Sequence, residues 1–394
     1  MINQAYKQML GEKSVIRELS EYATERAKQI GPENVFDYSL GNPSVPVPQA
    51  FTEQLIRLAK DSDTMAVHGY SPSLGITSVR EKIAASLKQR FGLDYTKSNI
   101  FMTSGAAGAI AHALRAVTVP GDEVITFAPF FPEYRPYVNG SGAILKIVPP
   151  DLTGFQINFT AFASMFSEKT TAVLINTPNN PSGVAYRAET IRQLAAFLTQ
   201  KEQEYGHDIY LISDEPYREI VFQGADAPYV AAFYPNTLTC YSFSKSLSIP
   251  GERIGYVAVN PACRDAELIV QMCGQISRGT GHNCPPSIVQ LAVAEVAGMT
   301  ADLSVYETNM AILYRELMAL GFSCVKPNGT FYIFPQALEP DANAFCKHAL
   351  KYDLILVPGD SFGCPGYFRM AYCIPTEKVE RSRDALRKLA ADYQ

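Results

Sequence analysis

The stretch 171–183, Thr-Ala-Val-Leu-Ile-Asn-Thr-Pro-Asn-Asn-Pro-Ser-Gly, passes from an apolar run directly into a loop rich in Pro and Asn. A short, nearly continuous apolar run predicts a strand that is buried on both faces. Pro and Gly at this density predict a rigid turn. Apolar runs of the same kind recur at 123–128, 208–213, 238–243 and 254–259.

Helical patterns separate these runs. The segment 187–204 carries Ile191, Leu194, Ala195 and Leu198 at the i, i+3, i+4, i+7 spacing of an amphipathic helix. Strands that alternate with helices predict an α/β fold, with a mostly parallel sheet flanked by helices and right-handed crossovers. Ligands of such sheets bind at the carboxyl ends of the strands, so the loops there are the first place to look for chemistry.

The last hundred residues have a different pattern, which predicts a separate, smaller α+β unit. A long helical stretch comes first, then a Pro-Asn-Gly turn, short β-rich runs on either side of a helix and a Gly/Pro-rich loop, and a charged helix. These segments are 285–320, 327–329, 330–334 and 367–373 around the loop 358–366, and 376–392.

Composition narrows the class of protein. The chain has 394 residues, and 34 basic against 39 acidic residues give a formal charge of −5, which argues against a nucleic-acid partner. The first residues lack the apolar core of a secretory signal, and no apolar run is long enough to span a membrane, so we expect a cytoplasmic protein. The eight cysteines form no C-x-x-C pair and histidines number five, so we expect no metal site and no disulfides.

Lys245 follows the run 238–243 directly and is flanked by Ser242 and Ser244. A lysine shielded from water and near other cations loses its proton more easily and becomes a nucleophile toward carbonyl groups. Arg253, eight residues later, and the two serines are suited to bind a phosphate monoester beside it. The alternative for Lys245 is a solvated loop lysine.

Three other loops at strand ends carry polar or small residues. Asp214-Glu215-Pro216-Tyr217 places a carboxylate at the end of the run 208–213, although a helix N-cap is an alternative. Asn176–Gly183 is a turn rich in Asn. Thr103–Gly108 opens a helix with small residues, which either lets backbone N–H groups approach an anion or serves tight helix packing.

In this order, these motifs resemble those of the class I/II aminotransferases, which are fold type I enzymes dependent on pyridoxal 5′-phosphate (PLP), and the resemblance covers nearly the whole chain. It implies an N-terminal segment (1–48) that joins the small domain, a large PLP-binding domain (49–287) and a C-terminal small domain (288–394). The matching stretches are Ser39–Pro43, Tyr70–Gly75, Gly105–Ala107, Asn176–Gly183, Asp214–Tyr217, Ser242–Lys245 with Arg253, and Phe368–Met370.

The resemblance assigns roles to four residues around the cofactor ring. It implies that Lys245 forms the Schiff base with PLP and later shuttles a proton, and that Asp214 pairs with the pyridine nitrogen. A carboxylate beside that nitrogen keeps it protonated, and the pyridinium withdraws electrons. Asn180 and Tyr217 match groups that donate hydrogen bonds to the ring oxygen.

Further roles follow from the same resemblance. Phe131 matches an aromatic residue that stacks on the ring, although a core aromatic is the alternative. Arg369 matches the arginine that binds the substrate α-carboxylate as a bidentate fork, and Gly41 and Asn180 lie beside that carboxylate. Tyr70 matches a tyrosine that reaches the phosphate from the neighbouring subunit, so a homodimer is implied. The residues expected to bind the phosphate are Gly105, Ala106, Ala107, Ser242 and Arg253.

The substrate side chain is less well determined. Family members that act on aspartate need a second cation to bind its side-chain carboxylate. Some members place a lysine for this purpose in the helix of the phosphate loop, at a position where this chain has Ala107. Other members use an arginine of the partner subunit, five residues before an Asn near a Pro pair, and Arg278 stands in that relation to Asn283 and to Pro285-Pro286. If Arg278 binds a distal carboxylate, then aspartate, glutamate and 2-oxoglutarate are favoured. If Arg278 is only a surface or phosphate-side arginine, an aromatic or aliphatic amino donor fits equally well.

Three other functions are alternatives to an aminotransferase. A PLP-dependent carbon–sulfur β-lyase would use nearly the same residues, because one carbanion can partition in several ways. A regulator on the same fold would carry a DNA-binding segment ahead of the Gly41 motif, for which we expect no room. A nicotinamide-dependent dehydrogenase is disfavoured because no G-x-G-x-x-G opens the first βα turn.

Overall fold

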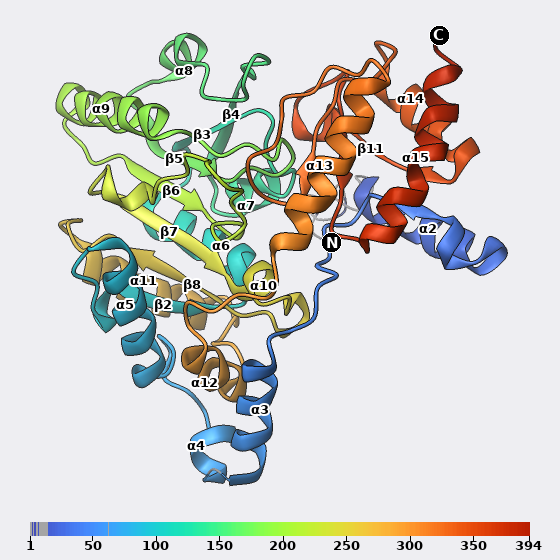
Figure 1. Ribbon diagram of the computed structural model, residues 1–394. Helices are drawn as coiled ribbons and strands as arrows, with labels where there is room; N and C mark the ends of the chain where they lie inside the picture. The colour runs from blue at the N-terminus through green and yellow to red at the C-terminus, as the bar shows by residue number, and fades with distance from the viewer. Residues whose placement is uncertain (1, 3, 5–6, 8–14, 62) are drawn as a thin grey trace.

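The computed structural model describes residues 2, 4, 7, 15–61 and 63–394 (Figure 1). Its centre is a seven-stranded sheet in the order β2-β8-β7-β6-β5-β3-β4. All neighbouring strands are parallel except β8, which runs antiparallel to both β2 and β7. The predicted α/β fold with a mostly parallel sheet is therefore confirmed. The strands are β2 (Ile100–Thr103), β3 (Glu123–Phe127), β4 (Ile144–Val148), β5 (Thr170–Asn176), β6 (Tyr210–Asp214), β7 (Thr237–Ser242) and β8 (Gly255–Val259).

Helices cover both faces of this sheet, as the apolar runs predict. On β5, Ala172 and Leu174 pack with α6 (Gly105–Val117) and α11 (Ala266–Gly279). The alternate residues Val173 and Ile175 pack on the other face with α8 (Phe159–Met165) and α9 (Ala188–Tyr205), the helix predicted at 187–204. Burying one such side chain stabilises the fold by about 1.5–3 kcal/mol, so the sheet is a rigid base for the loops at its ends.

The predicted long helical stretch 285–320 is mostly helical but is interrupted. The structure has two helices, α12 (Ser287–Glu295) and α13 (Ser304–Ala319), and Gly298 between them adopts a φ of +94°, which continues no right-handed helix. α12 packs on α3 (Gln49–Asp61) and α5 (Thr77–Phe91), low in Figure 1. In the connection, the amide of Ala301 donates to the carbonyl of Ser246 over 2.7 Å and so ties it to the loop that carries Lys245.

Both ends of the chain contribute to a second, smaller unit, at the upper right of Figure 1. Near the N-terminus, β1 (Phe36–Asp37) pairs in parallel with β10 (Leu354–Ile355). An antiparallel sheet has the order β11-β12-β9, and helices pack around it. The domain limits 48/49 and 287/288 stay predictions. The remaining elements here are β9 (Tyr332–Ile333), β11 (Val357–Pro358), β12 (Phe368–Ala371), α2 (Val15–Ile30), α14 (Ala342–Ala349) and α15 (Thr376–Ala391).

Short helices occupy several connections. Three are α-helical: α4 (Thr64–His68), α7 (Tyr134–Asn139) and α10 (Phe243–Ser246). Among the described residues, no helix is long and apolar enough to cross a membrane, and no group of three or more His, Cys, Asp or Glu side chains could hold a metal ion. The 3-10 helices are Pro32–Asn34, Lys97–Asn99, Val230–Ala232, Pro250–Glu252, Leu350–Tyr352 and Gly359–Phe362.

Candidate active site

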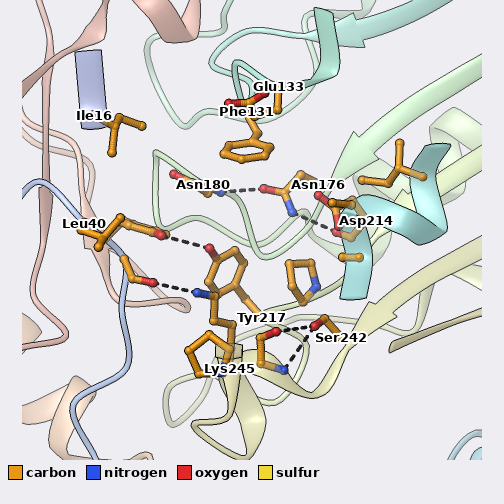
Figure 2. A pocket seen from close by; sticks show the side chains of 18 of the residues that line it. Ile16, Leu40, Phe131, Glu133, Asn176, Asn180, Asp214, Tyr217, Ser242 and Lys245 are labelled. Atoms are coloured by element: carbon orange, nitrogen blue, oxygen red, sulfur yellow. Dashed lines mark hydrogen bonds between the residues drawn. The ribbon is translucent and has the colours of Figure 1, made fainter. Parts of the chain in front are cut away.

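A cavity of about 480 Å³ lies where β5, β6 and β7 end (Figure 2). The last residues of these three strands, Asn176, Asp214 and Ser242, all line it, as expected for the carboxyl edge of a parallel sheet. The structure brings eleven of the predicted site residues together in the lining: Gly41, Ala106, Ala107, Phe131, Asn180, Asp214, Tyr217, Ser242, Lys245, Arg253 and Arg369.

Asp214 is a buried carboxylate with one free oxygen. Its side chain is 4% exposed, and Oδ2 accepts a hydrogen bond of 2.6 Å from the hydroxyl of Tyr134. Oδ1 is buried and has no hydrogen-bond partner in the described part of the chain. Burial raises the pKa of Asp214 from 3.8 to about 7, against the lowering effect of the Tyr134 hydrogen bond. A buried acceptor of this kind calls for a ligand with an N–H donor.

Lys245 lies in the short helix α10, directly after β7. The hydroxyl of Ser242 caps this helix and accepts from the amide of Ser244 at 3.2 Å. The Lys245 ammonium donates to the carbonyl of Gly41 over 2.7 Å. Burial lowers the pKa of Lys245 to about 8, and the cations Arg253 and Arg369 act in the same direction. A fraction of the amine is therefore neutral and nucleophilic near physiological pH.

An anion-binding corner faces Lys245. Helix α6 begins at Gly105, with Ala106 and Ala107 in the cavity wall, and the amides of a helix N-terminus attract anions. Gly105 has a φ of +73°, and a Cβ there would lie 2.8 Å from Nη2 of Arg253. Gly105 itself does not line the cavity, so its part is to leave room for the arginine. Together with the hydroxyl of Ser242, this corner is suited to a phosphate.

Arg369 enters the cavity from β12 of the smaller unit and is 1% exposed. Its Nη1 donates to Oδ1 of Asn180 at 3.0 Å, and its Nη2 donates to the carbonyl of Ser39. Nε is buried without a partner among the described residues, and burial lowers the pKa of the guanidinium. A buried guanidinium whose hydrogen bonds all go to neutral groups favours a carboxylate ligand.

Hydrogen bonds also hold the polar residues of the cavity in place. The backbone N–H of Asn180 donates to Oδ1 of Asn176 at 2.7 Å, and Nδ2 of Asn176 donates to the backbone carbonyl of Asp214 at 2.9 Å. The hydroxyl of Tyr217 lies 3.0 Å from that of Tyr332. In the view of Figure 2, Asn180 and Asn176 are drawn between the ring of Phe131 and Tyr217, and all four residues line the cavity.

Besides Gly105, two predicted site residues, Tyr70 and Arg278, lie outside the lining of this cavity. Tyr70 is fully exposed, and Arg278, at the end of α11, is exposed and donates to Gln275 over 3.3 Å. Both line a separate hollow of about 600 Å³ that is also formed by the segment 283–288. The structure therefore places them together, but away from the Lys245 of their own chain.

Sequence reasoning missed several residues of the lining. Tyr332 comes from the smaller unit, and a Cβ on Gly41 would lie 1.9 Å from its hydroxyl, which explains the glycine. Ile16 and Arg17, at the start of α2, close one side. Glu133 and Tyr137 also line the cavity. The sequence signal for them was that they closely follow Phe131, which was itself a predicted site residue.

The family model for aminotransferase class I and II matches residues 33–386. The chain belongs to this family. This class I/II aminotransferase is a PLP-dependent transaminase, as the family and its named relatives establish.

Relatives of this aminotransferase carry different substrate names. A solved amino transferase from Eubacterium rectale is 43% identical, with a TM-score of 0.97, and the match covers 100% of this chain and 99% of that one. An aspartate aminotransferase from Geobacillus stearothermophilus is 29% identical, covering 93% of this chain and 94% of the relative. An aromatic-amino-acid aminotransferase from Thermococcus litoralis is 28% identical, covering 91% and 92%.

The cavity of this aminotransferase fits PLP on three observations. The buried, unpartnered Oδ1 of Asp214 suits a protonated ring nitrogen. The corner at Gly105, where Arg253 fills the place of a side chain, suits a phosphate. Lys245 supplies the amine that an aldehyde requires. The chemistry of the donor set therefore matches the three ends of the cofactor.

Proposed function

We propose that this aminotransferase exchanges amino groups between an L-amino acid of the aspartate or glutamate type and a 2-oxo acid such as 2-oxoglutarate, by ping-pong chemistry. The observation that carries the proposal is one cavity that joins the Lys245 amine, the unpartnered oxygen of Asp214 and a buried Arg369 whose hydrogen bonds to other described residues go to neutral groups. These groups suit a cofactor and an amino-acid carboxylate side by side.

Each end of the cofactor has its own residues in this proposal. When PLP is bound, Asp214 would accept the hydrogen bond of the ring nitrogen, Tyr217 and Asn180 would donate to the ring oxygen, and Phe131 would pack on the ring. Ser242, Arg253 and the amides at the start of α6 would bind the phosphate. When bound, PLP supplies the electron-withdrawing ring that makes the Cα–H of the amino acid acidic.

The protein's own groups then handle the substrate and the proton. Arg369, held by Asn180, binds the α-carboxylate and so orients Cα toward Lys245. Lys245 Nζ takes the Cα proton and returns it. A pKa near 8 favours this general base, because catalysis is most efficient when that pKa lies near the working pH.

A second cation in the same cavity supports the preference for a dicarboxylic substrate. Arg17 of α2 lines the cavity, and its exposed guanidinium makes no hydrogen bond or ion pair with other residues that the structure describes. We propose that Arg17 binds the distal carboxylate. Arg278 stays a second proposal for this role, acting on the cavity of a partner subunit.

A homodimer is part of the proposal. Tyr70 and Arg278 line one hollow, and the fully exposed Tyr70 ring would be shielded from water by a partner chain. Light scattering of the Tyr70→Asp variant beside the natural chain tests this point, with the dimer expected to weaken.

Donor selectivity tests the function and separates the two arginines. We would measure kcat/KM for aspartate, glutamate, phenylalanine and leucine with 2-oxoglutarate. Arg17→Gln should lower the value for aspartate by about 10- to 100-fold, as expected for a lost charged hydrogen bond, and change phenylalanine little. The same four kcat/KM values are measured for Arg278→Gln. Arg192→Gln on α9 is the control, because Arg192 lies on the surface outside the cavity.

The outcomes discriminate between explanations. An equal loss with all four donors after Arg17→Gln would indicate a general effect of Arg17 on the cavity and not binding of the distal carboxylate. Activity of the natural chain with phenylalanine alone would overturn the aspartate-type proposal. No transfer with any donor would overturn the proposed reaction.

A further inference from the structure

We propose that Tyr134 is a positioning residue that keeps Asp214 ionised for its proposed partner, the cofactor's ring nitrogen, through the hydrogen bond between its hydroxyl and Oδ2. The inference rests on the proposed role of Asp214, and it goes beyond that role because it names what holds the carboxylate in its working state.

The geometry of this contact is specific. Tyr134 begins α7 and is 1% exposed, and it reaches the end of β6, 80 residues further along the chain. The two oxygens are 2.6 Å apart, the distance of a strong hydrogen bond from a hydroxyl to a carboxylate. With Tyr134 on Oδ2, the carboxylate leaves only Oδ1 free, so one oxygen is reserved for the ligand.

The surroundings of Asp214 otherwise oppose its charge. Burial raises its pKa, and so does the neighbouring carboxylate Glu215. The hydrogen bond from Tyr134 is the influence that lowers it. The other titratable groups facing Asp214 donate no hydrogen bond to its side chain; they are Tyr217 from its own loop, Tyr137 of α7 and Cys240 of β7.

Tyr134 also supports a second wall of the site. Its ring meets that of Phe131 edge to face, with centroids 5.8 Å apart and an interplanar angle of 83°. One side chain thus fixes both the carboxylate that faces the ring nitrogen and the aromatic residue proposed to cover the ring.

Without the phenolic donor, Asp214 would take up a proton at higher pH. A neutral carboxylic acid does not stabilise a protonated pyridine nitrogen, so the cofactor would bind less tightly at low pH and recover as the pH rises. Tyr134→Phe removes the hydroxyl and keeps the ring that contacts Phe131. Tyr234→Phe is the matched control, because Tyr234 is also buried and its hydroxyl donates to the carbonyl of Ile209 over 2.7 Å, but it does not line the cavity.

The experiment measures the dissociation constant of PLP by equilibrium dialysis between pH 6 and pH 9, without any turnover. For Tyr134→Phe we expect binding weaker by about 10- to 100-fold at pH 6–7, with the deficit shrinking toward pH 9. Tyr234→Phe should follow the natural chain. In the Asp214→Asn background, Tyr134→Phe should add no pH dependence.

An equal loss of affinity at every pH, or a profile like that of the natural chain, would overturn the inference. If Tyr134→Phe does not fold, 3-fluorotyrosine at position 134 replaces it: a more acidic phenol donates more strongly, so the binding profile should move to lower pH, and no movement would refute the idea. Failure of the natural chain to bind PLP would instead refute the proposed function.

Discussion

The substitution Asp214→Asn should stabilise the cofactor-free protein at neutral and alkaline pH. Asp214 is 4% exposed, and among the described residues its side chain has one hydrogen-bond donor, Tyr134, and no ion-pair partner to compensate for burial of the charge. The folded protein therefore holds a proton on this group more tightly than the unfolded chain does. Asparagine keeps the shape, and its carbonyl oxygen can still accept from Tyr134.

The magnitude follows from the proton affinity. The pKa of Asp214 is 3.8 unfolded and about 7 folded, so ionisation in the folded state costs about 4 kcal/mol. Because the folded state binds more protons between pH 4 and pH 7, the free energy of unfolding of the natural chain should fall as the pH rises through this window. Asparagine has no such slope. The advantage of the variant should grow from pH 4 and level off above pH 7.

Urea unfolding of both cofactor-free proteins at pH 5, 6, 7 and 8 measures this difference. The side chain of asparagine leaves an unpartnered N–H group at every pH, which costs about 1–3 kcal/mol. This cost lowers the variant's free energy of unfolding equally at every pH and does not change its pH dependence. The slope is therefore the diagnostic quantity. Parallel pH dependences for the two proteins would refute the idea that Asp214 is a charge destabilised by burial.

Three further results are expected. Lys245→Ala should remove the absorbance band of the lysine-bound cofactor and lower kcat by at least about 100-fold, whereas retention of the band would place the covalent site elsewhere. Arg369→Lys should raise KM for every amino acid by about 10- to 100-fold, because a point charge replaces a bidentate fork; a change for one donor alone would contradict this. Gly105→Ala should weaken binding of PLP more than that of pyridoxal without phosphate, since its Cβ displaces Arg253, and an equal effect on both would argue against the phosphate corner.

The sheet and most of the cavity could be predicted because the relevant signals are local in the chain. Each strand is a short apolar run followed directly by a polar loop, and parallel strands bring such loops to one edge. Asn180, Asp214 and Lys245 are therefore neighbours in space for the same reason that each one follows a strand. The break in the predicted helical stretch 285–320 was not foreseen, because the apolar pattern continues past Gly298.

The remaining site residues could not be predicted because their positions depend on packing between distant segments. Tyr134 reaches Asp214 only because α7 lies beside the end of β6. Tyr332 and Arg17 enter the cavity from the smaller unit, whose orientation is set by the core between the two ends of the chain. Arg278 differs from these residues. Its spacing to Asn283 suggested a role in substrate binding, but it does not line the cavity of its own chain.

The pairing of β1 with β10 has a consequence for how the protein is made. Phe36 is synthesised long before its partner Leu354. The segment that positions Gly41 beside Lys245 therefore has no strand to pair with until Leu354 has been made, whereas the seven-stranded sheet needs no residue beyond Val259. Truncation shortly before residue 354 should leave the central sheet able to fold but the N-terminal segment open to proteases.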